Sequence, residues 1–177
     1  VLVHYRSQFT ARLNEYAALH HRECSGGREE LEVRYQTVSS VQDPSAEVSV
    51  LTEQLRCHME AHQAAERASR LCLSGPHKDD LLVTIDGRDA KSYASQGQTR
   101  TAALSMKLAE REIYKNATGE YPVLLLDDVL SELDPKRQEF VLNRIAGGQV
   151  FITCCEDDRL PQMLGGRVFH VEHGAIR

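Results

Sequence analysis

Residues 123–128 read VLLLDD, four apolar residues followed by two acids, Asp127 and Asp128. The apolar run contains no alternating polar residues, which is typical of a strand buried on both faces at the centre of a parallel sheet. In open α/β sheets, ligands bind beyond the carboxyl ends of the strands. The stretch therefore predicts an α/β fold in which Asp127 and Asp128 lie at the ligand-binding edge of the sheet.

The sequence around this strand alternates between helix and strand patterns. The expected helices are residues 99–116 and 135–145, and the expected strands are residues 81–85, 150–153 and 167–171. Pro135 suits the first turn of a helix, and Asp86-Gly87 is a dipeptide favoured in two-residue hairpin turns. Strands and helices at this spacing are typical of α/β architecture.

The first part of the chain has a mainly helical pattern, with apolar residues three and four positions apart. The expected elements are helices at residues 2–21 and 51–71, a strand at residues 31–35 and a loop at residues 43–45. The strand is predicted from an alternation with period two, as in a half-buried strand. We therefore divide the chain into a helical lobe, residues 1–73, and an α/β subdomain, residues 74–177.

The composition is that of a folded protein without a membrane span. Of the 177 residues, 41% are hydrophobic and 27% are charged, and no apolar run approaches the roughly 18 residues that cross a bilayer. We expect a cytoplasmic protein with no membrane partner.

The net charge of −5 means that DNA binding would need a local basic patch. The five cysteines form no C-x-x-C pair, which argues against structural zinc. The chain opens at Val1 rather than Met, directly at the helix expected from residue 2, so we expect a fragment.

A second informative stretch, ASQGQTR at residues 94–100, stands where the helix at 99–116 is expected to begin. Small residues that open a helix leave backbone N–H groups and the positive end of the helix dipole free, and together these form an anion site. A phosphate group fits such a site. The alternative is ordinary capping of the helix by Ser95 or Thr99.

The two acids after the apolar strand suit phosphate chemistry. One carboxylate can hold Mg²⁺, directly or through water, and a second can orient and deprotonate the water that attacks a γ-phosphate. Two adjacent aspartates could also simply end a strand in a polar turn. The sequence SELD at residues 131–134 favours the phosphate interpretation, as does the small-residue loop at residues 94–100.

Three of these stretches resemble motifs of the ABC-type ATPases. SQGQ at residues 95–98 resembles the signature loop, LLLDD at 124–128 resembles the Walker B strand, and SELD at 131–134 resembles the D-loop. GPHKDD at residues 75–80, together with the run 95–108, narrows the resemblance to the RecF family. That family is similar to the SMC class of head domains.

The resemblance is specific from Gly75 to Cys155 and looser upstream. It implies the C-terminal part of an ABC-type P-loop ATPase head with a mainly helical second lobe. The family further implies ATP-driven dimerisation on DNA in recombinational repair, in replication-fork maintenance and in the SOS response. Implied partners are gapped DNA with single-stranded to double-stranded junctions, RecR and RecO, and the implied cofactors are ATP and Mg²⁺.

The resemblance also implies roles for individual residues. Asp127 would coordinate Mg²⁺, and Asp128 would occupy the position of the catalytic carboxylate. Three residues would close over the γ-phosphate of an ATP molecule held by the other subunit, namely Ser95, Gly97 and Gln98. Ser131 and Asp134 would lie at the dimer interface, so the active site would form only between two protomers.

The sequence departs from the ABC pattern in two places. Many ABC ATPases carry a switch histidine after the next strand, whereas here Cys154 follows Thr153. A thiol cannot replace the imidazole that senses the γ-phosphate, so we expect slow turnover or a sensor elsewhere. The sequence also lacks a P-loop, G-x-x-x-x-G-K-[ST], and its nearest stretch, GRDAKS at residues 87–92, has no glycine before the lysine. We expect the full-length parent to be a weak ATPase and this chain alone to be inactive.

Other functions remain open at this point. The chain could be the nucleotide-binding half of a transporter or an SMC protein, although transporters carry a signature nearer LSGGQ and an SMC head follows a far longer coiled coil. It could be a receiver domain, whose acidic pair however lies near the first strand, or a non-catalytic docking module. No basic cluster marks the DNA contacts, and His77 and Lys78 could face phosphate or cap a turn.

Overall fold

The computed structural model describes residues 1–130, 133–154 and 166–177. The chain divides into two compact units, Val1–Ile113 and Tyr114–Arg177. The boundary falls inside one long helix, α4 (Gln96–Thr118). The division into lobes after residue 73, expected from the sequence, remains a prediction about the parent protein.

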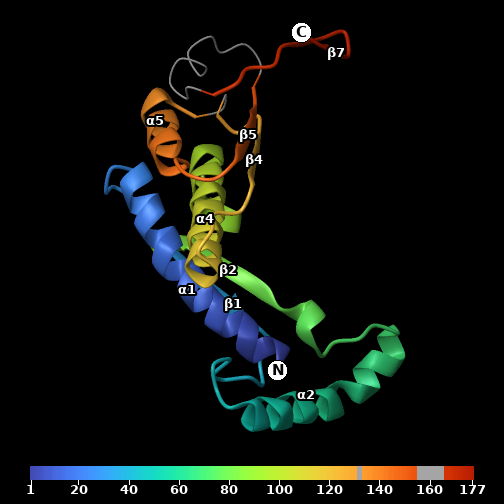
Figure 1. The fold of residues 1–177 in the computed structure, drawn as a ribbon. Coiled ribbons are helices and arrows are strands. Elements are labelled where there is room, and N and C mark those ends of the chain that lie inside the picture. Colours follow the sequence, from blue (N-terminus) through green and yellow to red (C-terminus); the bar gives the residue numbers. More distant parts are fainter. Residues whose placement is uncertain (131–132, 155–165) are drawn as a thin grey trace. The chain divides into compact units, whose positions relative to one another are not determined.

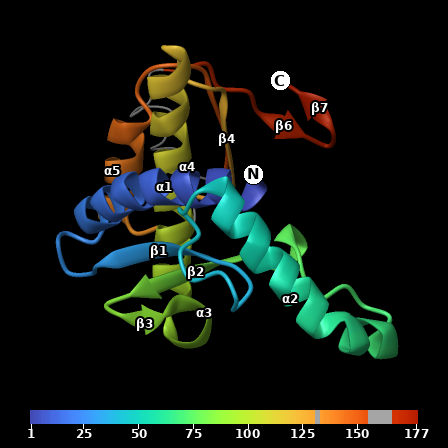
Figure 2. The same cartoon turned by 90° about the horizontal axis from the view of Figure 1, so that it is seen from below.

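The first unit is built from helices packed with a small antiparallel sheet. Its elements, before α4, are α1 (Leu2–Cys24), β1 (Leu31–Gln36), α2 (Val48–Ser69), η1 (Pro76–Lys78), β2 (Asp80–Ile85), β3 (Arg88–Asp89) and α3 (Ala90–Tyr93). Figure 2 shows α1 lying along the β1–β2 ribbon. The core contains apolar side chains from α1, β1, β2 and α4, namely Leu13, Ala17, Leu31, Val33, Ile85, Ala102 and Ala109.

The three strands of this unit form one antiparallel sheet in the order β1-β2-β3. Val33 pairs with Val83, although 50 residues separate them in the chain, and Ile85 pairs with Arg88 across a two-residue turn. Asp86 and Gly87 in that turn have φ values of 51° and 73°, as a type I′ hairpin turn requires. The hairpin predicted from Asp86-Gly87 is therefore confirmed.

Helix α2 is largely exposed. Its buried residues are Leu51 and His58, and Leu51 belongs to a second apolar cluster with Val3, Val38 and Val41. The predicted loop at residues 43–45 is confirmed by a local turn, in which the Asp43 carboxylate accepts hydrogen bonds from Ser45. None of the helices in the described part of the chain combines the length and the apolar character that crossing a membrane requires.

A buried carboxylate ties the start of β2 to α1 and β1. Asp79, whose side chain is 2% exposed, accepts hydrogen bonds from Arg6 Nη1 at 2.9 Å, Thr37 Oγ1 at 2.6 Å and the Tyr35 hydroxyl. Burial, followed by the hydrogen bond to Asp79, raises the pKa of Tyr35 to about 12. Arg6 also donates to the carbonyl of Pro76. Within the GPHKDD stretch, Asp79 thus has a structural role.

The second unit contains a parallel strand pair and a C-terminal hairpin. Its elements after α4 are β4 (Leu124–Asp127), α5 (Pro135–Arg144), β5 (Val150–Thr153), β6 (Val171–Glu172) and β7 (Ala175–Ile176). Strands β4 and β5 lie side by side in Figure 1, in register from Leu124–Val150 to Asp127–Thr153. The helix predicted at Pro135 and the strand predicted at residues 150–153 are confirmed.

Two expectations for this unit were wrong. The VLLLDD strand is not buried on both faces, because Leu126 is 5% exposed whereas Leu125 is 70% exposed. Within the described residues β4 pairs with β5 alone, so in this chain it is one of two strands and has no neighbour on its other side. The strand expected at residues 167–171 is limited to Val171–Glu172, because its ladder partner across the turn, Ala175–Ile176, is also two residues long.

Candidate nucleotide-binding elements

The acidic end of β4 is organised by a threonine on the neighbouring strand. Asp127 pairs with Thr153 in the parallel ladder, so both residues end their strands at the same edge. Thr153 Oγ1 donates to Asp127 Oδ1 at 2.5 Å and accepts the Asp128 backbone N–H at 3.0 Å. One hydroxyl therefore fixes the Asp127 carboxylate and the Asp128 backbone together.

Asp128 ends the strand through an unusual backbone conformation. Its φ is 52°, in the left-handed region that aspartate tolerates better than most residues. Its N–H also lies 3.1 Å from the Thr153 carbonyl. The two acids therefore lie at the end of a strand, as the sequence predicts. Because Asp128 is not extended, the two side chains do not simply point to opposite faces of the strand as neighbours in an extended chain do.

The oxygen atoms at this edge fit Mg²⁺ as a ligand set. Asp127 and Asp128 are exposed carboxylates, and Mg²⁺ is usually bound by one or two carboxylates, with substrate phosphates and water completing its octahedron. Among the described residues no group of three His, Cys, Asp or Glu side chains could hold a metal ion. Two carboxylates at one edge suit a metal that completes its coordination with a phosphate ligand and water.

The predicted signature loop forms a capping box at the start of α4. Ser95 Oγ accepts the Gln98 backbone N–H at 3.3 Å, and Gln98 Oε1 accepts the Ser95 N–H at 2.9 Å. This reciprocal pattern satisfies two backbone donors of the first turn. The N–H groups of Gln96 and Gly97 lie in the same turn, where an α-helix offers them no internal acceptor. N-capping by Ser95 is thus present, and it uses the Ser95 and Gln98 N–H groups and not those of Gln96 and Gly97.

The other end of the Gln98 amide contacts a residue that the sequence analysis missed. Gln98 Nε2 donates to Glu29 Oε1 at 3.2 Å. Glu29 belongs to none of the sequence motifs and lies in the loop between α1 and β1. No signal in the sequence pairs it with Gln98, because the contact depends on how α1, the sheet and α4 pack.

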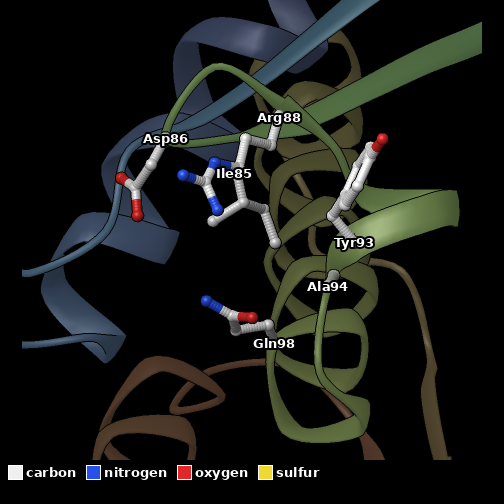
Figure 3. Close-up of a pocket in the computed structure, with 6 residues that line it drawn as sticks. All are labelled: Ile85, Asp86, Arg88, Tyr93, Ala94 and Gln98. Carbon is white, nitrogen blue, oxygen red and sulfur yellow. The ribbon is translucent and has the colours of Figure 1, made fainter.

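A cavity of about 330 Å³ adjoins the same loop. The residues that line it are Ile85, Asp86, Arg88, Tyr93, Ala94 and Gln98. Figure 3 shows Arg88, from the hairpin, above Gln98, from α4, across this open space. Arg88 is exposed and lines the same cavity as Gln98, so a cation faces this cavity near the start of α4.

The remaining predicted positions have local explanations. Asp134 caps α5, accepting the N–H groups of Lys136 and Arg137, and pairs with the Arg137 guanidinium at 3.3 Å. Ser131 lies outside the described residues. Cys154 follows β5 and is exposed. His77 Nε2 lies 3.1 Å from the Cys72 carbonyl, as in a turn contact.

The structure thus assembles two groups of predicted residues, one in each unit. Asp127 and Asp128 meet at Thr153 in the second unit, and Ser95, Gly97 and Gln98 share the first turn of α4 in the first unit. We further predict that the two groups lie at the same edge of one sheet in the parent protein.

Comparison with known proteins gives consistent results. No family model matches the chain. It is 40% identical to the DNA replication and repair protein RecF of Alkaliphilus oremlandii over 99% of its length and 42% identical to that of Bacillus subtilis over 97%. These alignments cover 48% and 47% of the relatives, so the chain spans about half the length of the curated relatives it matches.

Solved structures agree with the sequence relatives. The fold is similar to that of the recombination mediator protein RecF-ATPrS in the RecFOR pathway, with a TM-score of 0.81 and 34% identity, covering 98% of this chain and 45% of that one. A RecF-ATP structure gives a TM-score of 0.74 and 36% identity, covering 87% of this chain and 41% of that one. These neighbours confirm the predicted fold class, part of an ABC-type ATPase. Over nearly its whole length, the chain is therefore homologous to proteins named RecF, as expected for the C-terminal part of such a protein.

Proposed function

We propose that the chain supplies the signature loop and the Walker B acids of an ATP-dependent protein that dimerises on DNA during recombinational repair. The observation that carries this proposal is the Thr153 hydroxyl, which joins Asp127 and Asp128 where two parallel strands end. Such an arrangement fixes the Asp127 carboxylate and the Asp128 backbone at the edge where open α/β sheets bind ligands.

Within this site, Asp127 would hold Mg²⁺ and Asp128 would act on water. Mg²⁺, when bound, neutralises charge that develops on the phosphate oxygens. Asp127 has one carboxylate oxygen fixed by Thr153, which limits its rotation and so orients it as a ligand. Asp128 would orient the attacking water and accept its proton.

The start of α4 would bind the γ-phosphate of ATP held by a second protomer. The exposed Ser95 and Gly97 lie where backbone N–H groups and the helix dipole favour an anion. Gln98 would complete this contact, and Ser131 and Asp134 would lie at the dimer interface. The phosphate-binding P-loop, which this sequence does not contain, would come from the rest of the parent protein.

The proposed partners follow from the family. One solved relative is described as a recombination mediator of the RecFOR pathway, which supports gapped DNA, RecR and RecO as partners and the cytoplasm as the location. The same relatives argue against a transporter half or a receiver domain. A non-catalytic docking module remains the second candidate for the isolated chain, because it has no P-loop of its own.

The proposal is tested in the full-length protein by measuring mass in solution with and without ATP. Ser95→Arg is expected to abolish ATP-driven dimerisation while ATP still binds the monomer, because the new side chain fills the anion site. Asp128→Asn is expected to accumulate the dimer, because hydrolysis no longer dissolves it. A Ser95→Arg protein that dimerises as the wild type does would exclude the signature role.

A further inference from the structure

The Gln98 side chain is held at both ends of its amide. Its Oε1 accepts the Ser95 N–H at 2.9 Å and its Nε2 donates to Glu29 Oε1 at 3.2 Å. The oxygen and nitrogen of an amide have nearly the same shape, but only the oxygen can accept the Ser95 N–H. In the opposite orientation, the NH₂ group would face another donor. An acceptor on the far side therefore selects the orientation that keeps the capping box closed.

Glu29 is well placed to be that acceptor, because its loop is anchored on α1. Ser25 Oγ accepts the Glu29 N–H at 3.3 Å, and the Ser25 carbonyl accepts the Arg28 Nε–H at 2.9 Å. The Gly27 N–H also binds the Arg22 carbonyl at 2.7 Å. Ser25 itself is 1% exposed. The backbone that carries Glu29 is thus fixed to the end of a core helix.

The second oxygen of Glu29 is fixed by a buried histidine. His21 Nε2 lies 3.1 Å from Glu29 Oε2, and the His21 side chain is fully buried while that of Glu29 is 18% exposed. A carboxylate with one oxygen against buried His21 and the other against Gln98 has little freedom to rotate. The contacts run from His21 in α1, through Glu29, to the first turn of α4.

We propose that Glu29 is a positioning residue for the signature loop, holding the Gln98 amide in the orientation that keeps Ser95 and the N-terminus of α4 ready for an anion. This inference rests on the proposed function, since it concerns how that loop is presented. Glu29 acts through Gln98 and would not touch the nucleotide. Its effect should appear when two protomers associate, and not when one protomer binds ATP.

The experiment compares two substitutions of equal length in the full-length protein. Glu29→Met removes both acceptors, whereas Glu29→Gln keeps one oxygen that can accept from Gln98. Glu29→Met is expected to raise the protein concentration at half-dimerisation in saturating ATP about tenfold, as loss of one hydrogen bond to a charged group would. Glu29→Gln should recover most of that loss. Affinity of the monomer for ATP should not change in either.

The matched control is Glu30→Ala, which removes the same charge from the next residue. Glu30 is exposed, and within the described residues it bonds to Asp86 through its backbone, its N–H donating to Asp86 Oδ1 and its carbonyl accepting the Asp86 N–H. It should dimerise as the wild type does. Amide exchange at Ser95, compared with exchange at core amides, supplies a second readout, because general loss of stability would speed exchange at both. It should be faster in Glu29→Met and unchanged in Glu30→Ala.

The outcomes separate the two proposals. Suppose that Ser95→Arg abolishes dimerisation, whereas Glu29→Met leaves both dimerisation and Ser95 exchange unchanged. The positioning role is then wrong and the proposed function stands. If the methionine variant does not fold, Glu29→Ala takes its place. If Ser95→Arg itself has no effect, the proposed function fails, whatever Glu29 does to amide exchange. A Glu29→Gln protein as impaired as Glu29→Met would also overturn the role assigned to the acceptor oxygen.

Discussion

At the scale of single residues, Thr153 and Asp79 show how one side chain can organise several others. Thr153 bridges Asp127 and Asp128 through one hydroxyl. Asp79 accepts hydrogen bonds from three donors, Arg6 in α1 and Tyr35 and Thr37 at the end of β1. The first residue shapes the proposed site, and the second holds the fold that carries it.

Replacing Thr153 by valine should impair ATP hydrolysis more than ATP binding in the full-length protein. The substitution keeps the branched shape but removes the hydroxyl that orients Asp127. Loss of one charge-assisted hydrogen bond corresponds to roughly a tenfold fall in the rate constant for ATP hydrolysis, measured on the full-length protein under single-turnover conditions. Thr153→Ser keeps the hydroxyl and should retain most of the activity. Equal rates for the valine and serine variants would contradict the bridging role.

Replacing Asp79 by asparagine should destabilise the protein. In the wild type three donors share the Asp79 carboxylate, and in the variant the amide NH₂ would face one of them. We therefore expect a loss of about 1–3 kcal/mol in the free energy of unfolding. Arg6 should contribute little to this loss, because its side chain is 43% exposed. Urea unfolding of the full-length protein measures the change. The neighbouring Asp80→Asn, at an exposed position, should shift it by no more than about 0.5 kcal/mol.

At the scale of elements, helix ends determine where the functional residues stand. Helix α4 begins at the capping box of Ser95 and Gln98, and α5 begins at the Asp134 cap. Helix α2 ends near a third such device, in which Glu66 Oε1 accepts the backbone N–H groups of Leu73 and Ser74. Each carboxylate or amide satisfies backbone groups that would otherwise be left to solvent.

The cap at Glu66 should open in acid. The hydrogen bond from the Leu73 N–H is the main cause that holds the pKa of Glu66 below its ordinary value of 4.5. A lowered pKa means that the contact is fully present above pH 4.5 and is lost as the pH falls through the lower, folded value. Amide chemical shifts of Leu73 and Ser74, followed by NMR during an acid titration, should report that midpoint. A midpoint at or above 4.5 would show that the cap does not form.

At the scale of the whole molecule, apolar side chains on and beside β4 are exposed that a complete sheet would bury. Leu125 is 70% exposed, Val123 is 55% exposed and Phe151 is 51% exposed. The chain spans about half the length of its relatives, and we propose that the remaining half of the parent protein covers these side chains and supplies the P-loop.

Leu125→Ser should therefore behave differently in the two contexts. In the full-length protein, loss of a buried leucine should lower the free energy of unfolding by about 1.5–3 kcal/mol. In this chain alone the residue is mostly exposed already, so the change should be within about 0.5 kcal/mol. Parallel denaturation of both proteins measures the difference. Equal effects in the two proteins would argue against a covering segment at this strand.

Much of the fold follows from local patterns. The apolar spacing in α1 and α4, the Asp86-Gly87 turn and the acids after β4 each depend on residues close together in the chain, and the structure shows them where the sequence predicts them. The exposure of Leu125 could not be predicted from the sequence, because it depends on which strands lie beside β4. The family resemblance was carried by residues 95–98 and 124–128, which suit phosphate binding, and by residues 75–80 and 131–134.

The sequence by itself therefore determined the helices, most of the strands and the positions of Ser95, Asp127 and Asp128 within them, because local periodicity and turn chemistry set these. Only the tertiary structure decided that Glu29 meets Gln98, 69 residues away, and that Thr153 meets Asp127, 26 residues away. Such contacts depend on packing between distant segments. A polar residue without a motif shows no sign of its partner until the chain is folded.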